Sequence, residues 1–121
     1  MVVLAFGGRD FVDQNAVNMA LSQLHRKFPI SLLREGDARG ADRLSGIWAQ
    51  TNGIPLDVMP ADWDRYGKRA GFVRNQSMLD KEPHVTYAVC FPGGNGTMDM
   101  ARRIVECNRQ IILYVPYGYT Y

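Results

Sequence analysis

Two glycine-rich stretches contain the groups best suited to binding an anion. The first comprises Gly7, Gly8, Arg9 and Asp10, and the second comprises Pro92, Gly93, Gly94, Asn95, Gly96 and Thr97. Glycine lets a backbone N–H approach a ligand closely because no Cβ lies in the way. A helix beginning at Thr97 would add free N–H groups and the positive end of a helix dipole. The second stretch therefore predicts a phosphate site, although a strand-to-helix turn with a threonine cap has the same composition.

A third polar stretch combines a candidate anion clamp with a carboxylate. It comprises Gly36, Asp37, Ala38, Arg39, Gly40, Ala41 and Asp42. Arg39 can hold an anion, because a guanidinium binds phosphate bidentately. Asp42 can accept a hydrogen bond from a ribose hydroxyl or position an arginine. A capping aspartate beside a solvated arginine is the alternative, and Arg9 and Asp10 have a similar one, since they can pair with each other.

Two further segments add a cation and an aromatic ring. Arg74 and Asn75 open an expected helix, where Arg74 can supply a positive charge to a phosphate. The alternative is a solvated helix arginine. Asp62 and Trp63 lie in a segment without clear periodicity, and the indole there suits stacking on a base or sugar. The tryptophan can equally cover the edge of a sheet.

Short apolar runs alternate with helical periodicities, and this alternation positions the polar segments. The expected strands are Val2–Phe6, Ile30–Arg34, Ile54–Met59, Val85–Phe91 and Ile111–Val115. Their nearly continuous apolar character is typical of parallel strands covered on both faces. Residues 60–71 have no clear period and are expected to form a loop, and the tail 117–121 is not assigned.

Four helices are expected between these strands, each recognised by apolar residues at a 3.6-residue period. Asp13 caps the first, which Pro29 closes, and the conformational freedom of Gly53 suits the end of the second. The helices carry, in order, Val17, Ala20, Leu21, Leu24 and Phe28; Ala41, Leu44, Ile47 and Trp48; Phe72, Val73, Gln76 and Leu79; and Met100, Ala101, Ile104 and Val105.

Alternating strands and helices predict an α/β fold, a three-layer sandwich with a five-stranded parallel sheet. Right-handed crossovers and a central first strand give the strand order 3-2-1-4-5. Ligands of such sheets bind beyond the carboxyl ends of the strands where the order reverses, here between strands one and four. The loops leaving those strands are the two glycine-rich stretches. Topology and composition therefore predict the same site.

Composition limits the function. The 121 residues carry 14 Lys plus Arg against 12 Asp plus Glu, and this near-neutral balance disfavours duplex binding driven by phosphate neutralisation. The length fits a single domain over residues 1–121. No stretch approaches the roughly 20 apolar residues of a membrane span. Cys90 and Cys107 have no metal-ligand spacing and are expected to be reduced thiols of a cytoplasmic protein without a metal site.

Three common motifs are absent from the sequence. Without GxGxxG after the first strand, dinucleotide dehydrogenase chemistry is not supported. Without GxxxxGK[ST], hydrolysis of a magnesium-bound nucleotide is not supported either. The GxSxG spacing of a nucleophilic serine is also missing. No bound cofactor is expected.

Five ordered motifs together resemble the YspA-like branch of the SLOG superfamily, which is Rossmann-like. They are GGRDF at 7–11, REGDARGADRL at 34–44, PADWDRYGKRAG at 60–71, RNQSML at 74–79 and FPGGNGTMDM at 91–100. The superfamily includes the lysine-decarboxylase-like phosphoribohydrolases, the DprA core and proposed sensors of nucleotide-derived signals. The resemblance implies a phosphoribosyl or ADP-ribose-type ligand in the cleft that topology predicts.

The resemblance also indicates where this chain departs from a hydrolase. The phosphoribohydrolase pattern PGGxGTxxE has Met100 in place of its glutamate, and the acidic Asp99 lies one residue earlier, about 100° round the helix. The hydrolases' arginine motif, RKxxM, is matched by Arg74 and Met78, with Asn75 in place of the lysine. The resemblance therefore implies that the ligand-binding groups are kept, and it favours binding over catalysis.

Two functions from different classes follow. The first is a module that senses or sequesters a nucleotide-derived small molecule without turnover. The second is an N-glycoside hydrolase acting on a nucleoside 5′-monophosphate. In it, Asp99 or Asp10 stabilises the developing positive charge or activates water, and Arg74 holds the phosphate. Nucleic-acid binding like that of the DprA core is disfavoured by the charge. A homodimer is expected, with Tyr117, Tyr119 and Tyr121 as candidate interface residues.

Overall fold

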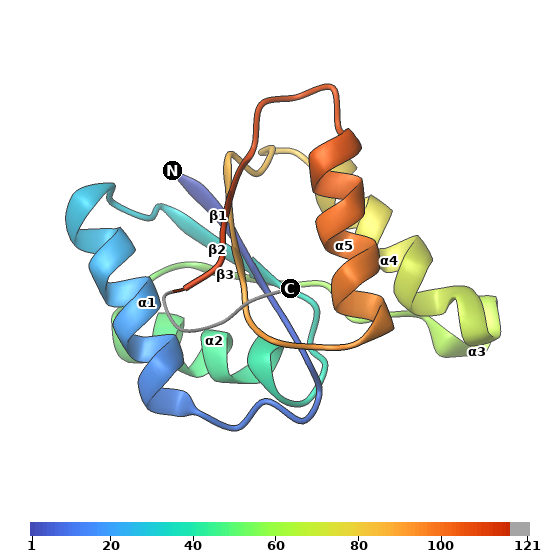
Figure 1. The fold of residues 1–121 in the computed structure, drawn as a ribbon, viewed down its shortest axis with the longest axis horizontal. Coiled ribbons are helices and arrows are strands. Elements are labelled where there is room, and N and C mark those ends of the chain that lie inside the picture. Colours follow the sequence, from blue (N-terminus) through green and yellow to red (C-terminus); the bar gives the residue numbers. More distant parts are fainter. Residues whose placement is uncertain (117–121) are drawn as a thin grey trace.

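Five short strands form one parallel sheet in the computed structural model, which describes residues 1–116. The strands are β1 (Val2–Phe6), β2 (Leu32–Glu35), β3 (Leu56–Val58), β4 (Tyr87–Cys90) and β5 (Ile112–Tyr114). Every neighbouring pair is parallel, and the order is β3-β2-β1-β4-β5 (Figure 1). The predicted α/β fold and strand order are confirmed.

Helices cover both faces of this sheet (Figure 1). They are α1 (Gln14–Lys27), α2 (Ala41–Thr51), α3 (Trp63–Tyr66), α4 (Ala70–Asp80) and α5 (Asn95–Glu106), with the 3-10 turn η1 (Gly67–Arg69) between α3 and α4. Side chains alternate along a strand. Val3 and Ala5 of β1 therefore pack with α1 and α2, whereas Leu4 and Phe6 pack with α4 and α5. The result is a Rossmann-like three-layer sandwich.

Two helix ends lie where the sequence predicts them. Asp13 accepts a hydrogen bond from Ala16 N at 3.0 Å and caps α1. Gly53 follows α2 with a φ of +67°, a conformation that glycine adopts without strain. These ends set where the chain turns back toward the sheet.

Two of the predicted apolar faces differ from the buried faces of their helices. Phe28 is 54% exposed, because it is the C-cap of α1 and its extended backbone carries it away from the helix. Ile47 is 49% exposed, because α2 buries Ser45, Trp48 and Ala49, a face rotated by about 100°. Amphipathic spacing predicts that a helix has a buried face more reliably than it predicts the limits of that face.

α4 and α5 show the same kind of difference. α4 buries Asn75 with Met78 and Leu79, and it exposes Phe72 and Gln76, which the sequence assigns to the apolar face. On α5, Val105 is exposed as well. The polar Asn75 is buried because its side chain has partners on α5, and periodicity of apolar residues cannot indicate such partners.

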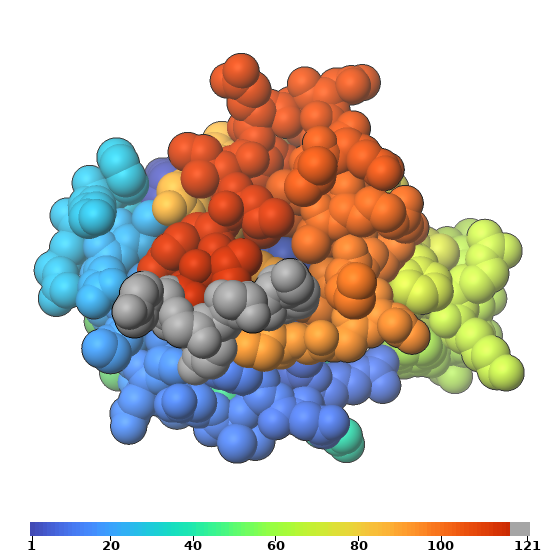
Figure 2. Space-filling view, viewed as in Figure 1, coloured from blue at the N-terminus to red at the C-terminus, as the bar shows by residue number. Residues whose placement is uncertain are grey.

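Residues 60–71 do not form the predicted loop. Asp62 accepts a hydrogen bond from Arg65 N at 3.1 Å and caps the single-turn helix α3. η1 follows, and α4 already begins at Ala70. No residue of α3 or η1 is buried, so apolar periodicity gives no signal there. This segment lies in the yellow-green projection at the right of Figures 1 and 2, next to α4.

Several remaining predictions concern the chain as a whole. No helix among residues 1–116 is long and apolar enough to cross a membrane. Cys90 is buried in β4, Cys107 is the C-cap of α5, and neither is in a disulfide. The tyrosines predicted at a dimer interface, at positions 117, 119 and 121, lie outside the described residues.

Candidate functional site

A cleft opens where the strand order reverses, beyond the carboxyl ends of β1 and β4. Its volume is about 380 Å³, which suits a small molecule. Its walls come from the β1–α1 loop, the start of α2, the α3–α4 segment and the β4–α5 loop. The predicted site residues that line it are Gly7, Gly8, Arg9, Asp10, Asp42, Trp63, Arg74, Asn75, Gly94, Asn95, Gly96 and Thr97. The cleft therefore lies at the position that topology predicts.

The glycines of the two loops have two different roles. Gly8 N donates to Pro92 O at 2.8 Å, so the β1–α1 and β4–α5 loops are in backbone contact. A Cβ on Gly8 would lie 2.8 Å from Gly93 Cα, and a Cβ on Gly93 would lie 2.6 Å from Gly8 N. At Gly94 and Gly96, apart from the adjoining residues and the backbone of the same helix, no atom of the described residues lies within 4 Å of the Cβ position. Close packing of the two loops therefore explains why positions 8 and 93 are glycine, whereas positions 94 and 96 face open space.

α5 begins at this cleft without a capping side chain. Its N-cap is Gly94, and its first turn contains no acidic residue. The helix begins at Asn95, two residues earlier than predicted. Thr97 is 5% exposed, and its hydroxyl makes no hydrogen bond to residues 1–116. This helix end therefore offers backbone donors, a hydroxyl group and the positive end of its dipole to an anion.

α2 begins at the same edge of the sheet, but the chain itself closes its N-terminus. Ala41 N donates to Gly8 O at 3.1 Å. Gly40 has a φ of +84° and lies so close to Gly8 O that a Cβ there would overlap it. Asp42 is buried in the first turn and accepts a backbone N–H at 3.3 Å. Burial raises the pKa of Asp42 to about 6, although the charge of Arg74 opposes this shift.

The exposed charges after β1 do not pair as neighbours in sequence. Arg39 Nη2 lies 3.0 Å from Asp10 Oδ1, and both side chains are well exposed, so the pair contributes little to stability. The guanidinium of Arg9 lies over the ring of Trp63, 5.4 Å from its centroid. These two contacts replace the alternative in which Arg9 pairs with Asp10.

Arg74 brings a fixed positive charge to the cleft. Its Nη1 donates to Gly36 O at 2.6 Å, and its Nε donates to Asn75 Oδ1 at 3.2 Å. A Cβ on Gly36 would lie 2.8 Å from the guanidinium carbon, so this glycine makes room for the arginine. Burial lowers the pKa of Arg74, the charge of Asp42 raises it, and the charge of Arg9 lowers it again. The guanidinium nevertheless stays protonated.

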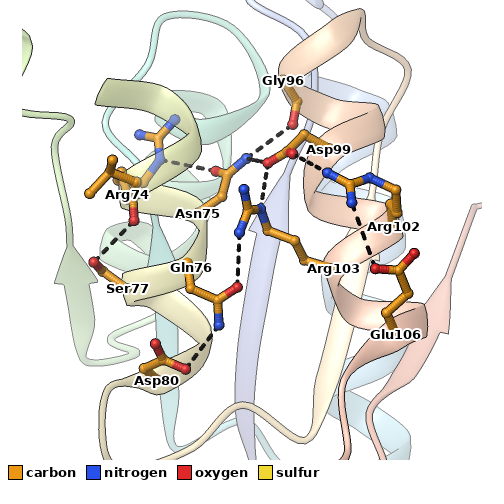
Figure 3. Close-up of polar contacts among 11 residues, drawn as sticks. Arg74, Asn75, Gln76, Ser77, Asp80, Gly96, Asp99, Arg102, Arg103 and Glu106 are labelled. Atoms are coloured by element: carbon orange, nitrogen blue, oxygen red, sulfur yellow. Dashed lines mark hydrogen bonds and ion pairs between the residues drawn. The ribbon is translucent and has the colours of Figure 1, made fainter. Parts of the chain in front are cut away.

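Asn75 and Asp99 join α4 to the first turns of α5 beside the cleft (Figure 3). Asn75 Nδ2 donates to Gly96 O and to Asp99 Oδ2, both at 3.1 Å. Asp99 also accepts from Arg103 Nε at 2.7 Å and from Arg102 Nη2 at 2.8 Å. Burial raises the pKa of Asp99, but these hydrogen bonds outweigh it, and the pKa lies below its ordinary value. Asp99 does not line the cleft, and its contacts hold the start of α5.

Some predicted site residues lie outside the cleft. Gly36 and Arg39 line an adjoining groove. Gly40 and Gly93 pack against backbone, and Asp62 caps α3, so these three shape the site without lining it. Within residues 1–116, no three His, Cys, Asp or Glu side chains are grouped so that they can hold a metal ion.

Two side chains of interest were missed by sequence reasoning. Glu35 ends β2 with 3% exposure and accepts from Asp37 N at 2.5 Å. Burial raises the pKa of Glu35 to about 7. Lys68, in η1, lines the cleft together with Arg9 and Arg74. The sequence signal available for Glu35 was a carboxylate at the end of an apolar strand. The signal for Lys68 was a lysine in an aperiodic segment.

The fold and the cleft define a class of protein: a Rossmann-like α/β domain with a cationic, glycine-lined cleft at the point where the strand order reverses. The model of the YspA, cpYpsA-related SLOG family matches residues 1–66. The chain belongs to this family, as its motifs predict. The match includes Arg9 and Asp42 and ends before Arg74 and the β4–α5 loop.

One relative matches over most of both chains. The Gene 61 protein of Mycobacterium phage D29 is 35% identical over 118 residues, which cover 91% of this chain and 93% of the phage protein. This similarity extends well beyond the part that the family model matches. No solved structure matches the chain.

Proposed function

We propose that the cleft binds a nucleotide-derived small molecule through a phosphate group, and that the protein senses or sequesters this molecule without converting it. The phosphate lies at the N-terminus of α5, against Gly94, Gly96 and the Thr97 hydroxyl, with Arg74 as its cation. The sugar or base lies against the indole of Trp63. A nucleoside monophosphate and an ADP-ribose-like molecule both have this chemistry.

The observation that carries this proposal is the uncapped N-terminus of α5, which opens into the same cleft as Arg74, an arginine that feels the charge of Asp42 but forms no salt bridge among residues 1–116. Gly94 and Gly96 leave the approach free, and the Thr97 hydroxyl is unused by the described residues. Arg74 forms no ion pair with residues 1–116, and Gly36 O and Asn75 hold its guanidinium in place. A bound anion would satisfy the helix donors and neutralise the local charge. Membership of the SLOG family is consistent with such a ligand.

Binding without turnover is supported by the residues at and beside the position of the hydrolases' glutamate. Met100 is 1% exposed and packs in the core between the sheet and α4. Asp99, the neighbouring acid, is held by Arg102 and Arg103 and does not line the cleft. Neither residue presents a carboxylate to a ligand in the cleft, where a proton transfer would need one.

The second candidate function is hydrolysis of the N-glycosidic bond of a nucleoside 5′-monophosphate. Asp10 favours it, because its carboxylate lines the cleft and its side chain is 93% exposed. It can therefore activate water or stabilise the developing positive charge on the sugar. Incubation with a panel of nucleoside monophosphates separates the two functions. Free base released by the wild type but not by Asp10→Asn would establish the hydrolase, whereas intact bound nucleotide supports the sensor.

Arg74 provides the direct test of the phosphate site. In calorimetric titrations with AMP and ADP-ribose, we expect Arg74→Ala to weaken binding by roughly 1.5–3 kcal/mol, the range for a charged hydrogen bond. Arg74→Lys should recover only part of this loss, because a point charge replaces a fork. Arg69→Ala is the matched control, since Arg69 is an exposed arginine nearby that does not line the cleft. Equal affinities of the wild type and a normally folded Arg74→Ala would refute the phosphate site.

The cellular setting forms part of the same proposal. The two cysteines are thiols rather than a disulfide, which suits the cytoplasm of a cell or of a phage-infected host. Native mass spectrometry of the purified protein would identify a retained ligand by its mass. The same spectra would test the expected homodimer.

A further inference from the structure

The chain contains two Asn-Gly dipeptides, and they lie at opposite ends of two helices. The α5 dipeptide, Asn95 and Gly96, forms the first two residues of α5. The α2 dipeptide, Asn52 and Gly53, follows the last residue of α2. Asparagine before glycine is prone to deamidation, because glycine has no Cβ to hinder attack by its backbone nitrogen on the asparagine side chain. The two dipeptides therefore allow a comparison within one molecule.

Deamidation of such a dipeptide consumes only water. The backbone nitrogen of the glycine loses its proton and attacks the side-chain Cγ of the asparagine. The bond from Cγ to Nδ2 then breaks, and the amide nitrogen leaves as ammonia with that proton, so a five-membered succinimide ring remains. Water opens the ring at one of its two carbonyl carbons and gives either aspartate or isoaspartate. Both products carry a carboxylate where the protein had a neutral amide.

The reacting groups of the α5 dipeptide are free in the described part of the chain. Gly96 is the second residue of α5, so its N–H has no acceptor within the helix, and nothing else among residues 1–116 accepts from it. Asn95 is exposed, and its side-chain amide makes no hydrogen bond to these residues either. Gly96 O accepts from Asn75 Nδ2 at 3.1 Å (Figure 3). Gly96 is therefore held, whereas the side chain that precedes it can move.

Asn95 also lies at the end of its helix, where the backbone opens most easily. No side chain caps α5, and the first helical hydrogen bond runs from Met98 N to Gly94 O at 3.0 Å. Helix ends open at little cost in free energy. The Cγ of Asn95 can therefore reach the Gly96 nitrogen by local opening, while the rest of α5 stays folded.

Both reacting groups of the α2 dipeptide are engaged instead. Asn52 Nδ2 donates to Trp48 O at 2.8 Å, which holds the side-chain amide against the last turn of α2. Gly53 N donates to Gln50 O at 3.3 Å. Attack at this dipeptide first requires that both hydrogen bonds break, so we expect it to react more slowly.

The two helix dipoles act in the same sense as the hydrogen bonds. Loss of the glycine N–H proton leaves a negative charge on nitrogen, and the positive end of a helix dipole favours negative charge. Gly96 lies at the positive end of α5, whereas Gly53 lies beyond the negative end of α2. Electrostatics therefore favours reaction at the α5 dipeptide over the α2 dipeptide.

We propose that Asn95 is a deamidation site, and that its conversion ends the capacity of α5 to bind an anion. The reaction places a carboxylate in the first turn of α5, which has no acidic residue of its own. This carboxylate can accept from the free N–H groups of the helix, and it repels an incoming phosphate. α5 then resembles α2, whose first turn contains Asp42. The consequence for binding rests on the proposed function, whereas the reaction itself does not.

Peptide mapping by mass spectrometry measures both dipeptides in one sample. The full chain is incubated at 37 °C and pH 8 without nucleotide, and the conversion of each amide to an acid is followed with time. We expect the α5 dipeptide to react at least about threefold faster than the α2 dipeptide, the order of a dipole effect at each helix end. Equal rates, or a faster α2 dipeptide, would overturn the inference.

Asn95→Asp and Asn52→Asp form a matched pair that tests the consequence for binding. Each adds one carboxylate, and Asn52 does not line the cleft. In calorimetric titrations we expect Asn95→Asp to bind AMP at least about tenfold more weakly than the wild type, and Asn52→Asp to bind it equally well. Asn95→Asp should keep its melting temperature, because a carboxylate is favourable at a helix N-terminus. Wild-type affinity in a normally folded Asn95→Asp would overturn the inference.

Incubation with AMP separates this inference from the function on which it rests. AMP bound at the start of α5 takes the N–H of Gly96, so it should slow the α5 dipeptide and leave the α2 dipeptide unchanged. AMP that binds without slowing the α5 dipeptide would overturn the link between deamidation and binding. If no nucleotide binds to the wild type, the proposed function fails, and faster reaction of the α5 dipeptide still supports Asn95 as a deamidation site.

Discussion

α2 and α5 start alike and differ in their capacity to bind an anion. Each has a glycine as its N-cap, and each begins at the same edge of the sheet. At α2 the chain supplies the acceptors itself, because Gly8 O takes the N–H of Ala41 and the Asp42 carboxylate lies in the first turn. At α5 there is neither a capping side chain nor an acid in the first turn. A glycine and a helix start therefore make an anion site only where the chain has not already used the donors.

The charged residues around the N-termini of α2 and α5 also differ. Asp42 and Glu35 are buried near the start of α2. Arg9, Lys68 and Arg74 line the cleft into which α5 opens. A helix N-terminus favours negative charge. The N-terminus of α2 thus has an acid in its own first turn, whereas the described lining of the cleft at α5 has three cations against two carboxylates, those of Asp10 and Asp42. This balance supports a phosphate at α5 rather than at α2.

We expect Gly40→Ala to cause the largest loss of stability, because it disrupts the N-terminus of α2, where the chain itself supplies the acceptors. Gly40 has a φ of +84°, and a Cβ there would overlap Gly8 O and lie 2.6 Å from Arg9 O. Because an alanine at this φ is strained and its Cβ also clashes with the backbone, we expect the free energy of unfolding to fall by roughly 3 kcal/mol or more in urea denaturation. Gly94→Ala is the control, and its loss should stay within about 1 kcal/mol because its Cβ enters open space. Similar losses in the two variants would contradict the distinction.

Gly96→Ala tests whether the uncapped N-terminus of α5 binds an anion. Gly96 lines the cleft, and a methyl group there meets no described atom beyond its own helix, so we expect it to take space that a phosphate needs. We expect nucleotide affinity to fall at least about tenfold, or roughly 1.4 kcal/mol. The melting temperature should hold, because alanine favours a helix over glycine by about 0.5–1 kcal/mol. Calorimetric titration paired with thermal melts gives both results. A variant that melts several degrees lower and binds normally when folded would mean that this glycine serves only the turn.

The acids near α2 predict an unusual dependence of stability on pH. Burial raises the pKa of Glu35 from 4.5 to about 7 and that of Asp42 from 3.8 to about 6. At pH values between the ordinary and the raised pKa of each group, the folded protein keeps a proton that the unfolded chain has lost. The contribution of these two groups to the free energy of unfolding therefore decreases as pH rises from about 4 to about 7.

Urea denaturation from pH 5 to pH 8 measures this dependence. We expect the contribution of Glu35 to decrease by on the order of 1–3 kcal/mol over this range. Glu35→Gln keeps an acceptor for Asp37 N and removes the titration, so the difference between the wild type and the variant isolates this carboxyl group. A wild type that gains stability relative to Glu35→Gln as pH rises would contradict the assignment.

The arrangement of the two helix ends was predictable from the sequence because it follows from local patterns. Continuous apolar runs such as Val2–Phe6 predict central parallel strands, and Asp13 predicts the start of α1. Right-handed connections then bring the loops at 7–10 and 92–97 together at one edge. None of these steps needs knowledge of side-chain contacts, and all of them agree with the structure.

The partners of the charged side chains were not predictable in this way. Arg34 is fully buried, with Nε 2.7 Å from Asp57 Oδ2 and its other nitrogens bound to backbone carbonyls in the last turn of α4 and just after it. Asn75 is buried because Gly96 O and Asp99 accept its hydrogen bonds. These contacts join residues that are 21 or more positions apart in the chain. A single sequence shows which side chains are charged, but not which distant groups accept their hydrogen bonds. It therefore cannot distinguish the N-terminus of α2, where the chain itself supplies the acceptors, from the uncapped N-terminus of α5.

Thr97→Ala is expected to have the smallest effect and gives the finest test of the open helix end. The Thr97 hydroxyl lines the cleft and has no hydrogen bond to the described residues, so the folded protein loses no internal bond when it is removed. A bound phosphate loses one neutral donor while the backbone N–H groups of α5 remain. Affinity should therefore weaken by about 0.5–1.5 kcal/mol, and Thr97→Ser should retain most of it.

Thr51→Ala is the control for this variant, because its hydroxyl donates to Ile47 O at 2.9 Å on the exposed surface of α2 and does not line the cleft. We expect Thr51→Ala to leave nucleotide affinity unchanged in the same calorimetric titration. If Thr97→Ala also binds with wild-type affinity while Gly96→Ala does not, the phosphate contacts the backbone of α5 without reaching the hydroxyl. If neither variant changes affinity, the ligand does not use the open helix end, and the contrast between α2 and α5 has no bearing on binding.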